Sequence, residues 1–262
     1  MSALILVLVG IASGVTTALF GFGGGFVAVP VLVWADAALG DDAPRVAVAT
    51  SSVLMVVAAA VATASTSRTV LAELRGSGRL LGLLALGGAL GAVAARHVPG
   101  DVIAVGFVAY LLLTIAAVTA RPGVLQAGAD GARPLPAGAG LPIGAVAAFL
   151  GVGGSVVTVP LMRRNGHRMA VATALANPLT LAVALPATAV FLLLSGGRPV
   201  GAGAGFVGAV DVLAAAALLA GSLPVIVFLR RRGPRLSDRA HARWYVGLLV
   251  MVAVAMTAAL FR

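Results

Sequence analysis

Two glycine-rich segments, one in each half of the chain, have the spacing that could bind a ligand. Residues 21–30 read GFGGGFVAVP and residues 151–160 read GVGGSVVTVP. Glycine runs interrupt helices because each glycine costs about 1 kcal/mol relative to alanine. A helix that restarts after such a run, near Phe26 or Val156, presents free N–H groups and the positive end of its dipole. Two such helix starts facing each other predict an anion site.

The predicted site combines backbone donors with a few polar side chains from neighbouring spans. The backbone donors come from Gly23, Gly24, Gly25, Gly153, Gly154 and Ser155, and Ser155 adds a hydroxyl group. A Cβ at Gly24 or Gly154 is expected to clash with a closely approaching ligand or backbone and to restrict φ. The side-chain candidates are Thr50, Ser51, Ser52, Thr173 and Asn177. Two alternatives stay open: glycine runs also permit close helix packing, and hydroxyl groups also bond to their own helix.

Two arginines occupy matched positions, in RVAVAT at residues 45–50 and RMAVAT at residues 168–173. Arg45 and Arg168 are therefore either interfacial anchors or gates that attract anions. Asp211 precedes a complete span and is interpreted as its N-cap.

Metal and enzyme chemistry are not expected. His97, His167 and His241 are placed in loops without metal-ligand spacing, so no metal or cofactor is predicted. No catalytic arrangement of Ser, His and Asp lies at membrane depth. The absence of cysteine excludes disulfides and thiolate chemistry.

The composition requires lipid as the main solvent of these elements. Of 262 residues, 61% are hydrophobic and only 10% are charged, which excludes a soluble domain and a disordered chain. The net charge of +10 comes from arginines in short loops between apolar runs. This pattern indicates the positive-inside bias of a membrane protein rather than a nucleic-acid partner.

Six apolar runs are long enough to cross the bilayer, at residues 46–65, 80–95, 102–120, 170–194, 212–229 and 245–261. Residues 2–34 and 137–162 are interrupted by the glycine runs. Placing the arginine-rich loops in the cytoplasm makes each interrupted region a hairpin and puts both termini outside. Residues 2–20 are expected to be mature membrane sequence, because no basic segment precedes them.

The chain is therefore predicted to be an all-α polytopic membrane protein with two inverted repeats. Repeat 1 covers residues 1–120, a linker covers 121–136, and repeat 2 covers 137–262. Each repeat holds one glycine-broken hairpin and three transmembrane helices, and this odd number of crossings inverts the second repeat. Interrupted helices at matching positions indicate a secondary transporter.

The paired G-x-G-G-[GS]-x-x-x-x-P motifs resemble those of the TauE/SafE family of sulfite and organosulfonate permeases over nearly the whole chain. Ser155 stands where a third glycine is common in the family. The resemblance implies a multi-pass permease of the bacterial inner membrane that moves small sulfur-containing anions, usually outward. The expected partners are the anion, membrane lipid and possibly a second copy of the chain. The alternatives are an uptake permease for an organosulfonate or another small anion, and a non-transporting membrane scaffold.

Overall fold

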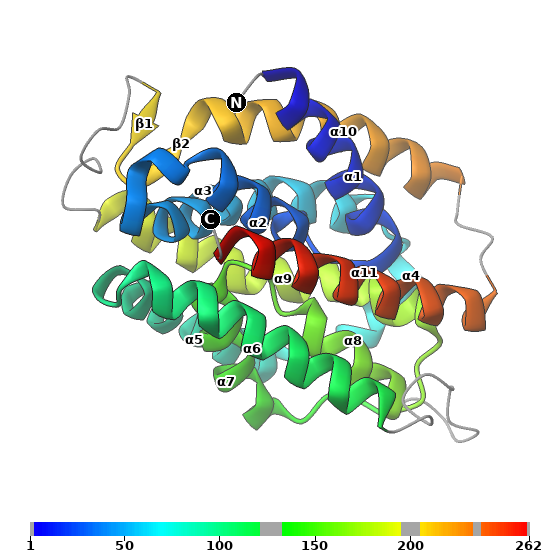
Figure 1. Cartoon of the computed structure of the whole chain (residues 1–262). Helices are drawn as coiled ribbons and strands as arrows, with labels where there is room; N and C mark the ends of the chain where they lie inside the picture. The colour runs from blue at the N-terminus through cyan, green and yellow to red at the C-terminus, as the bar shows by residue number, and fades with distance from the viewer. Residues whose placement is uncertain (1–2, 121–132, 195–204, 233–236, 261–262) are drawn as a thin grey trace.

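The computed structural model describes residues 3–120, 133–194, 205–232 and 237–260, and these residues are almost entirely helical (Figure 1). The described part also holds one antiparallel hairpin, in which β1 (Phe206–Val207) pairs with β2 (Val210–Asp211). The main helices are α1 (Ala3–Phe20), α2 (Gly25–Ala35), α3 (Ala43–Ala64), α5 (Gly78–His97), α6 (Gly100–Thr119), α7 (Gly140–Leu150), α8 (Ser155–Arg164), α9 (Met169–Leu193), α10 (Val212–Arg232) and α11 (Asp238–Leu260). Short helical segments are η1 (Ala37–Asp42), α4 (Arg68–Leu71), η2 (Ala72–Leu74) and η4 (Ala137–Ala139).

All six predicted spans are confirmed as long apolar helices, namely α3, α5, α6, α9, α10 and α11. In the described residues α1 is a seventh helix long and apolar enough to cross a membrane. In contrast, α2 and α7 have 11 residues each and α8 has 10, so none of them can cross alone. The protein is therefore a polytopic all-α membrane protein.

The helix interruptions fall at the two glycine runs. Helix α1 ends at Phe20 and α2 begins at Gly25, so residues 21–24 form the first break. Helix α7 ends at Leu150 and α8 begins at Ser155, so residues 151–154 form the second break. Both restarts come one residue earlier than predicted. In Figure 1 each pair folds back near the middle of the bundle, so both breaks lie at its core.

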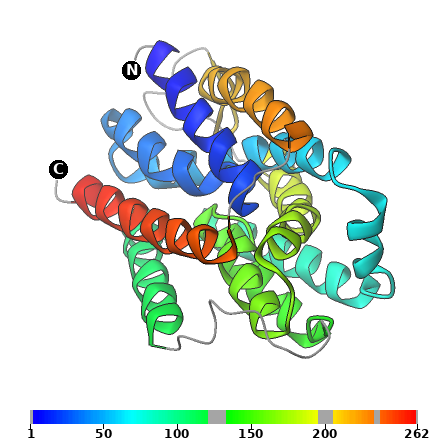
Figure 2. The ribbon, with the colours of Figure 1, turned by 90° about the vertical axis from the view of Figure 1, so that its right-hand side faces the viewer.

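Helices α3 and α9 are the most buried of the long apolar helices, and they pack against each other. Around them α1 packs on α10, and α7 packs on α5. Figures 1 and 2 show α1 beside α10 from both directions. Each broken pair thus lies against a long helix from the other half of the chain.

Glycine allows these helix pairs to approach closely. A Cβ at Gly14 of α1 would lie 2.6 Å from the carbonyl oxygen of Ser222 in α10. A Cβ at Gly140 of α7 would lie 2.8 Å from the carbonyl oxygen of Leu80 in α5. Small residues stabilise helix pairs in membranes because they bring the backbones into contact. The packing alternative therefore holds for these helical glycines.

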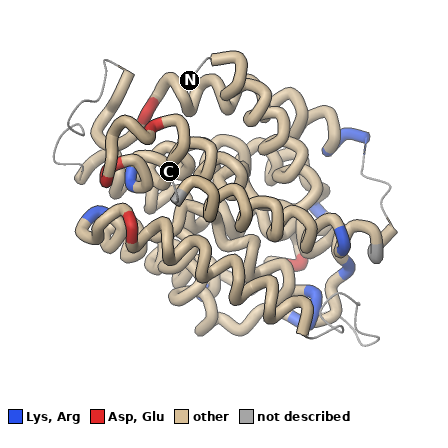
Figure 3. The backbone as a smooth tube through the Cα atoms, in the orientation of Figure 1, with Lys and Arg blue, Asp and Glu red and all other residues tan. Residues whose placement is uncertain are grey.

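Charged residues are segregated along the bundle. Figure 3 shows most of the described basic residues at one end, and most of the acidic ones at the other together with a few basic residues. The last turns of α8 and α10 bring Arg163 and Arg164, and Arg230 to Arg232, to the arginine-rich end. The positive-inside rule predicts that this end faces the cytoplasm.

This assignment predicts which positions a membrane-impermeant thiol reagent can reach. The chain contains no cysteine, so single Cys substitutions can be read without background. In intact cells, we expect Cys at Asp101 or Val207 to be labelled from outside. Cys at Arg75 or Arg164 should be labelled only after permeabilisation. Labelling of Arg75→Cys and Asp101→Cys from the same side would contradict the assignment.

Candidate functional site

The two helix breaks lie directly against each other. A Cβ at Gly25 would lie 2.6 Å from the carbonyl oxygen of Gly151. Thr180 of α9 lies against both breaks, because its Cγ2 would be 2.6 Å from a Cβ at Gly23 and 2.9 Å from one at Gly153. Met55 of α3 also lies against both. The breaks thus form one site, enclosed by the central pair α3 and α9.

Both breaks contain glycines with positive φ angles. Gly23 and Gly153 have φ values of +65° and +67°, a conformation that side chains with a Cβ rarely adopt. Gly24 also has a positive φ, and a Cβ there would lie 2.9 Å from Ser13 Oγ. The clash with backbone expected at Gly154 is wrong: its φ is −71°, and a Cβ would find its nearest protein neighbour at 3.4 Å. This is because Gly154 already has a helical backbone, as the N-cap of α8.

The breaks leave several backbone N–H groups without a hydrogen-bond acceptor among the described residues. Ser13 Oγ donates to the carbonyl of Gly24 at 2.8 Å, and Ser51 Oγ lies 3.1 Å from the carbonyl of Gly151. Within the described chain, the backbone N–H groups of Gly23, Gly24, Gly153 and Gly154 have no hydrogen-bond acceptor. The carbonyl groups are therefore partly occupied while donors remain free.

Four buried polar side-chain atoms near the breaks also lack a partner among the described residues. They are Ser155 Oγ, Thr158 Oγ1, Asn177 Oδ1 and Thr180 Oγ1, and all four side chains have no exposed surface. Buried polar groups are nearly always hydrogen-bonded, so a cluster of exceptions indicates a place for a ligand. Of the four, Ser155 and Asn177 were predicted.

Thr158 and Thr180 were not predicted, although helical spacing relates both to predicted residues. Thr180 follows Thr173 and Asn177 at positions i+7 and i+3, which places all three on one face of α9. Thr158 lies one turn after Ser155 on α8. Both signals appear only once the helix boundaries are fixed.

The other predicted hydroxyl groups are engaged in packing. Thr50 Oγ1 accepts a hydrogen bond from the backbone N–H of Asp211 at 3.0 Å, which turns Thr50 toward the acidic end. Ser52 Oγ donates to the carbonyl of Ala49 and accepts from Thr188 at 3.0 Å. Thr173 donates to its own helix at Ala170. Their contact with a substrate stays a prediction.

The paired arginines differ in their surroundings. Arg45 donates to the carbonyl of Val98 through Nε and Nη2, at 3.0 and 2.9 Å, and forms an ion pair with Asp42 at 2.9 Å. It joins the start of α3 to the turn between α5 and α6. Arg168 is exposed at the N-cap of α9. A gating role is untested for both.

The histidines do not form a metal site. The described residues contain no group of three His, Cys, Asp or Glu side chains that could hold a metal ion. His97 ends α5, and His167 Nε2 lies 3.4 Å from a carboxylate oxygen of Glu73. The loop placement of His241 is wrong: it is buried in α11 and contacts the carbonyl of Leu19 through Nε2. The helix begins at Asp238, earlier than its apolar part.

Two carboxylates at the acidic end, those of Asp36 and Asp211, influence each other. Asp211 caps α10 as predicted, because its Oδ1 accepts from the N–H of Ala214 at 2.9 Å. Burial, with a smaller effect of the Asp211 carboxylate, raises the pKa of Asp36 to about 6. Asp36 lies at the C-cap of α2, so this titrating group is at the mouth of the bundle rather than at the breaks.

An aromatic cluster supports the breaks. Phe22, within the first break, stacks on Phe26 with ring centroids 4.5 Å apart and on Tyr245 at 5.4 Å. The hydroxyl of Tyr245 donates to the carbonyl of Val156 at 2.8 Å. Helix α11 thereby connects the first break to the first turn of α8.

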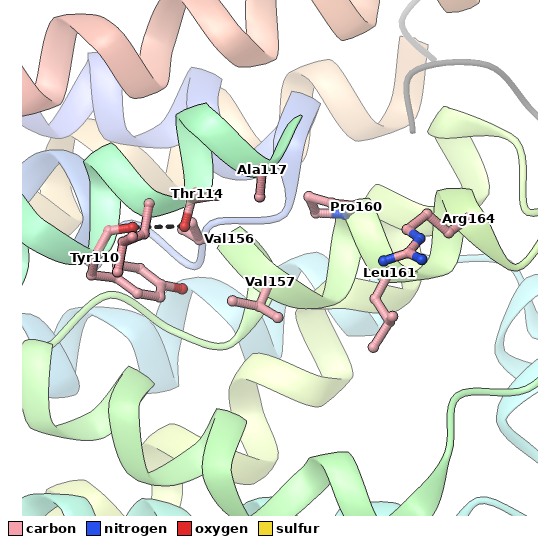
Figure 4. A pocket seen from close by; sticks show the side chains of 9 residues that line it. Tyr110, Thr114, Ala117, Val156, Val157, Pro160, Leu161 and Arg164 are labelled. Carbon is pink, nitrogen blue, oxygen red and sulfur yellow. Dashed lines mark hydrogen bonds between the residues drawn. The ribbon is translucent and has the colours of Figure 1, made fainter. Parts of the chain in front are cut away.

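A groove of about 340 Å³ lies between α6 and α8 (Figure 4). Tyr110 and Thr114 of α6 face Val156 and Val157, and Arg164 lies at its far end. The Thr114 hydroxyl donates to the carbonyl of Tyr110. The lining is mostly apolar, which suits a lipid chain better than an anion.

The geometry of the second break predicts different tolerances at adjacent glycines. Gly153→Ala should lower the free energy of unfolding by about 1–2 kcal/mol, because it forces alanine into the left-handed region and toward Thr180. Gly154→Ala should stay within about 0.5 kcal/mol of the unsubstituted protein. Unfolding of the purified protein in detergent measures both. Equal losses of unfolding free energy in the two variants would contradict the different backbone conformations of Gly153 and Gly154.

Comparison with known proteins gives the family. A family model described as sulfite exporter TauE/SafE matches residues 6–257, nearly the whole chain. No curated protein and no solved structure matches. The matched region contains both glycine breaks and all or most of every long helix described above. The chain therefore belongs to the sulfite exporter TauE/SafE family, whose members are membrane transporters of sulfur-containing anions and not enzymes.

Proposed function

We propose that this multi-pass transporter exports sulfite or an organosulfonate across the bacterial inner membrane and binds the anion between the two helix breaks. The observation that carries the proposal is the meeting of the breaks. They bring free backbone N–H groups and unpartnered buried hydroxyl groups into one enclosed place. The family description supports outward movement of a sulfur oxyanion.

The free donors suit an anion that must shed water. Hydrogen bonds to a charged group contribute about 1.5–3 kcal/mol each. Helices α2 and α8 both begin at the breaks, so the positive ends of their dipoles add to this attraction. Ser155, Thr158 and Thr180 add neutral hydroxyl donors. Such a site binds an anion without a buried cation that would hold it too tightly for release.

We further propose that the halves, residues 1–120 and 137–262 joined by the linker 121–136, are inverted repeats. The pattern of helix contacts supports this. The packing of α1 on α10 corresponds to that of α7 on α5, and the packing of α2 on α11 corresponds to that of α8 on α6. Exchanging the two halves also exchanges α3 with α9, so the contact between these two helices corresponds to itself. Such a relation allows alternating access around a fixed central site.

Removing single hydroxyl groups tests the site. Ser155→Ala and Thr180→Val should each weaken sulfite binding by about tenfold, because each removes one hydrogen bond to a charged ligand. Thr114→Val is a matched control, since that hydroxyl bonds to its own helix outside the site. Binding is measured by calorimetry on purified protein, and export by efflux from loaded vesicles.

These experiments test the location of the site separately from the substrate and the direction of transport. Unchanged affinity in both variants would place the anion elsewhere. The absence of sulfite or sulfonate binding and efflux in the unsubstituted protein would overturn the proposed substrate. Movement only toward the cytoplasmic face would overturn the direction.

The two arginines should respond differently to substitution. We propose that Arg168 attracts anions at the arginine-rich end and that Arg45 is a tether. Arg168→Gln should lower the rate of efflux several-fold at low ionic strength, with little effect at high salt, because salt screens exposed charges. Arg45→Gln should lower thermal stability, since it loses the bonds to Val98 and Asp42. If Arg168→Gln and Arg45→Gln changed efflux equally and independently of salt, the two arginines would not have the different roles proposed here.

A further inference from the structure

Asn177 holds its side-chain amide in one defined orientation. Its Nδ2 donates to the carbonyl of Thr173 at 3.2 Å and lies 3.5 Å from the carbonyl of Ala174. In a regular helix the N–H of residue 178 would bond to Ala174, but Pro178 has no N–H group. The amide nitrogen takes this place. The reverse orientation would put the amide oxygen against two carbonyl oxygens.

The oxygen of Asn177 is left as a buried acceptor. Oδ1 has no partner among the described residues, and the side chain has no exposed surface. Unlike a hydroxyl group, an amide oxygen can only accept. A fully deprotonated anion offers no donor, so it would leave this oxygen buried and unpaired at a cost in binding.

This acceptor belongs to the same face as the site. Asn177 lies three residues before Thr180, and Thr180 lies against both breaks. The lining therefore combines donors for a negative head with one acceptor that the head alone cannot satisfy.

We propose that Asn177 makes the site selective for anions that carry their own hydrogen-bond donor. The donor is either the proton of a protonated oxyanion, as in hydrogensulfite, or a hydroxyl or ammonium group on the organic part of a sulfonate. This inference rests on the proposed function. It assigns the polar contact that distinguishes one sulfur-containing anion from another.

Three sulfonates of similar size test the selectivity in the unsubstituted protein. 2-Aminoethanesulfonate or 2-hydroxyethanesulfonate should bind at least about tenfold more tightly than ethanesulfonate, which has no donor. For sulfite, affinity should rise as the pH is lowered and hydrogensulfite replaces the dianion. The sulfonate series and the sulfite titration thus distinguish the two sources of the donor. Equal affinity for all three sulfonates together with pH-independent sulfite binding would overturn the inference and leave the proposed function standing.

Substitution of Asn177 tests the assignment of the residue. Asn177→Leu should remove the preference, bringing the affinity ratio to within about twofold, while ethanesulfonate binding is kept. Thr17→Val is the control, because its buried hydroxyl bonds to its own helix at Ser13. A preference that survives in Asn177→Leu would overturn the role of Asn177. If that variant does not fold, the ligand series in the unsubstituted protein still decides whether the site is selective. Equal strengthening of all three sulfonates by sodium would show that a cation occupies the acceptor, which also overturns the inference.

Discussion

The constraint on which the rest of the structure depends is that a broken helix at membrane depth cannot rely on water for its backbone hydrogen bonds. The protein meets this constraint by placing the two breaks against each other and enclosing them with α3 and α9. Ser13 and Ser51 supply donors to two of the exposed carbonyl groups. The backbone N–H groups of Gly23, Gly24, Gly153 and Gly154 remain without an acceptor in the described chain, so the enclosed breaks retain donors suited to an anion.

This neutral arrangement has an advantage over a buried arginine. Charged side chains at the bilayer centre are costly, and a buried cation would bind an anion strongly in a low dielectric. Hydroxyl and amide groups can instead bind an anion through several hydrogen bonds, each of which contributes modestly to the binding free energy. Most of the described arginines instead lie toward one end of the bundle (Figure 3). Under the proposed function, an exposed arginine attracts the anion and neutral groups bind it.

The sequence was sufficient for features that depend on local chemistry. Apolar length located the six spans, and the glycine runs located both breaks to within one residue. Features set by long-range packing could not be predicted from the sequence. The partner of Thr50 is the backbone of Asp211, from a distant hairpin, and Thr180 reaches the site only because α9 packs against both breaks. The error at Gly154 arose because a glycine-rich run does not reveal which of its members has a positive φ.

The packing also defines which parts could move together. Because α1 lies on α10 and α7 lies on α5, each hairpin is held by the opposite half of the chain, through glycine contacts between backbones. Such contacts resist sliding, since the interdigitated backbones have few alternative arrangements. Two units that rock against each other would therefore combine one hairpin with long helices of the other half. They would meet where α3 crosses α9, a contact that includes the hydrogen bond from Thr188 to Ser52. The proposed anion site lies at this same contact, so a rearrangement that opens either end would also change the contacts around Thr180 and Met55.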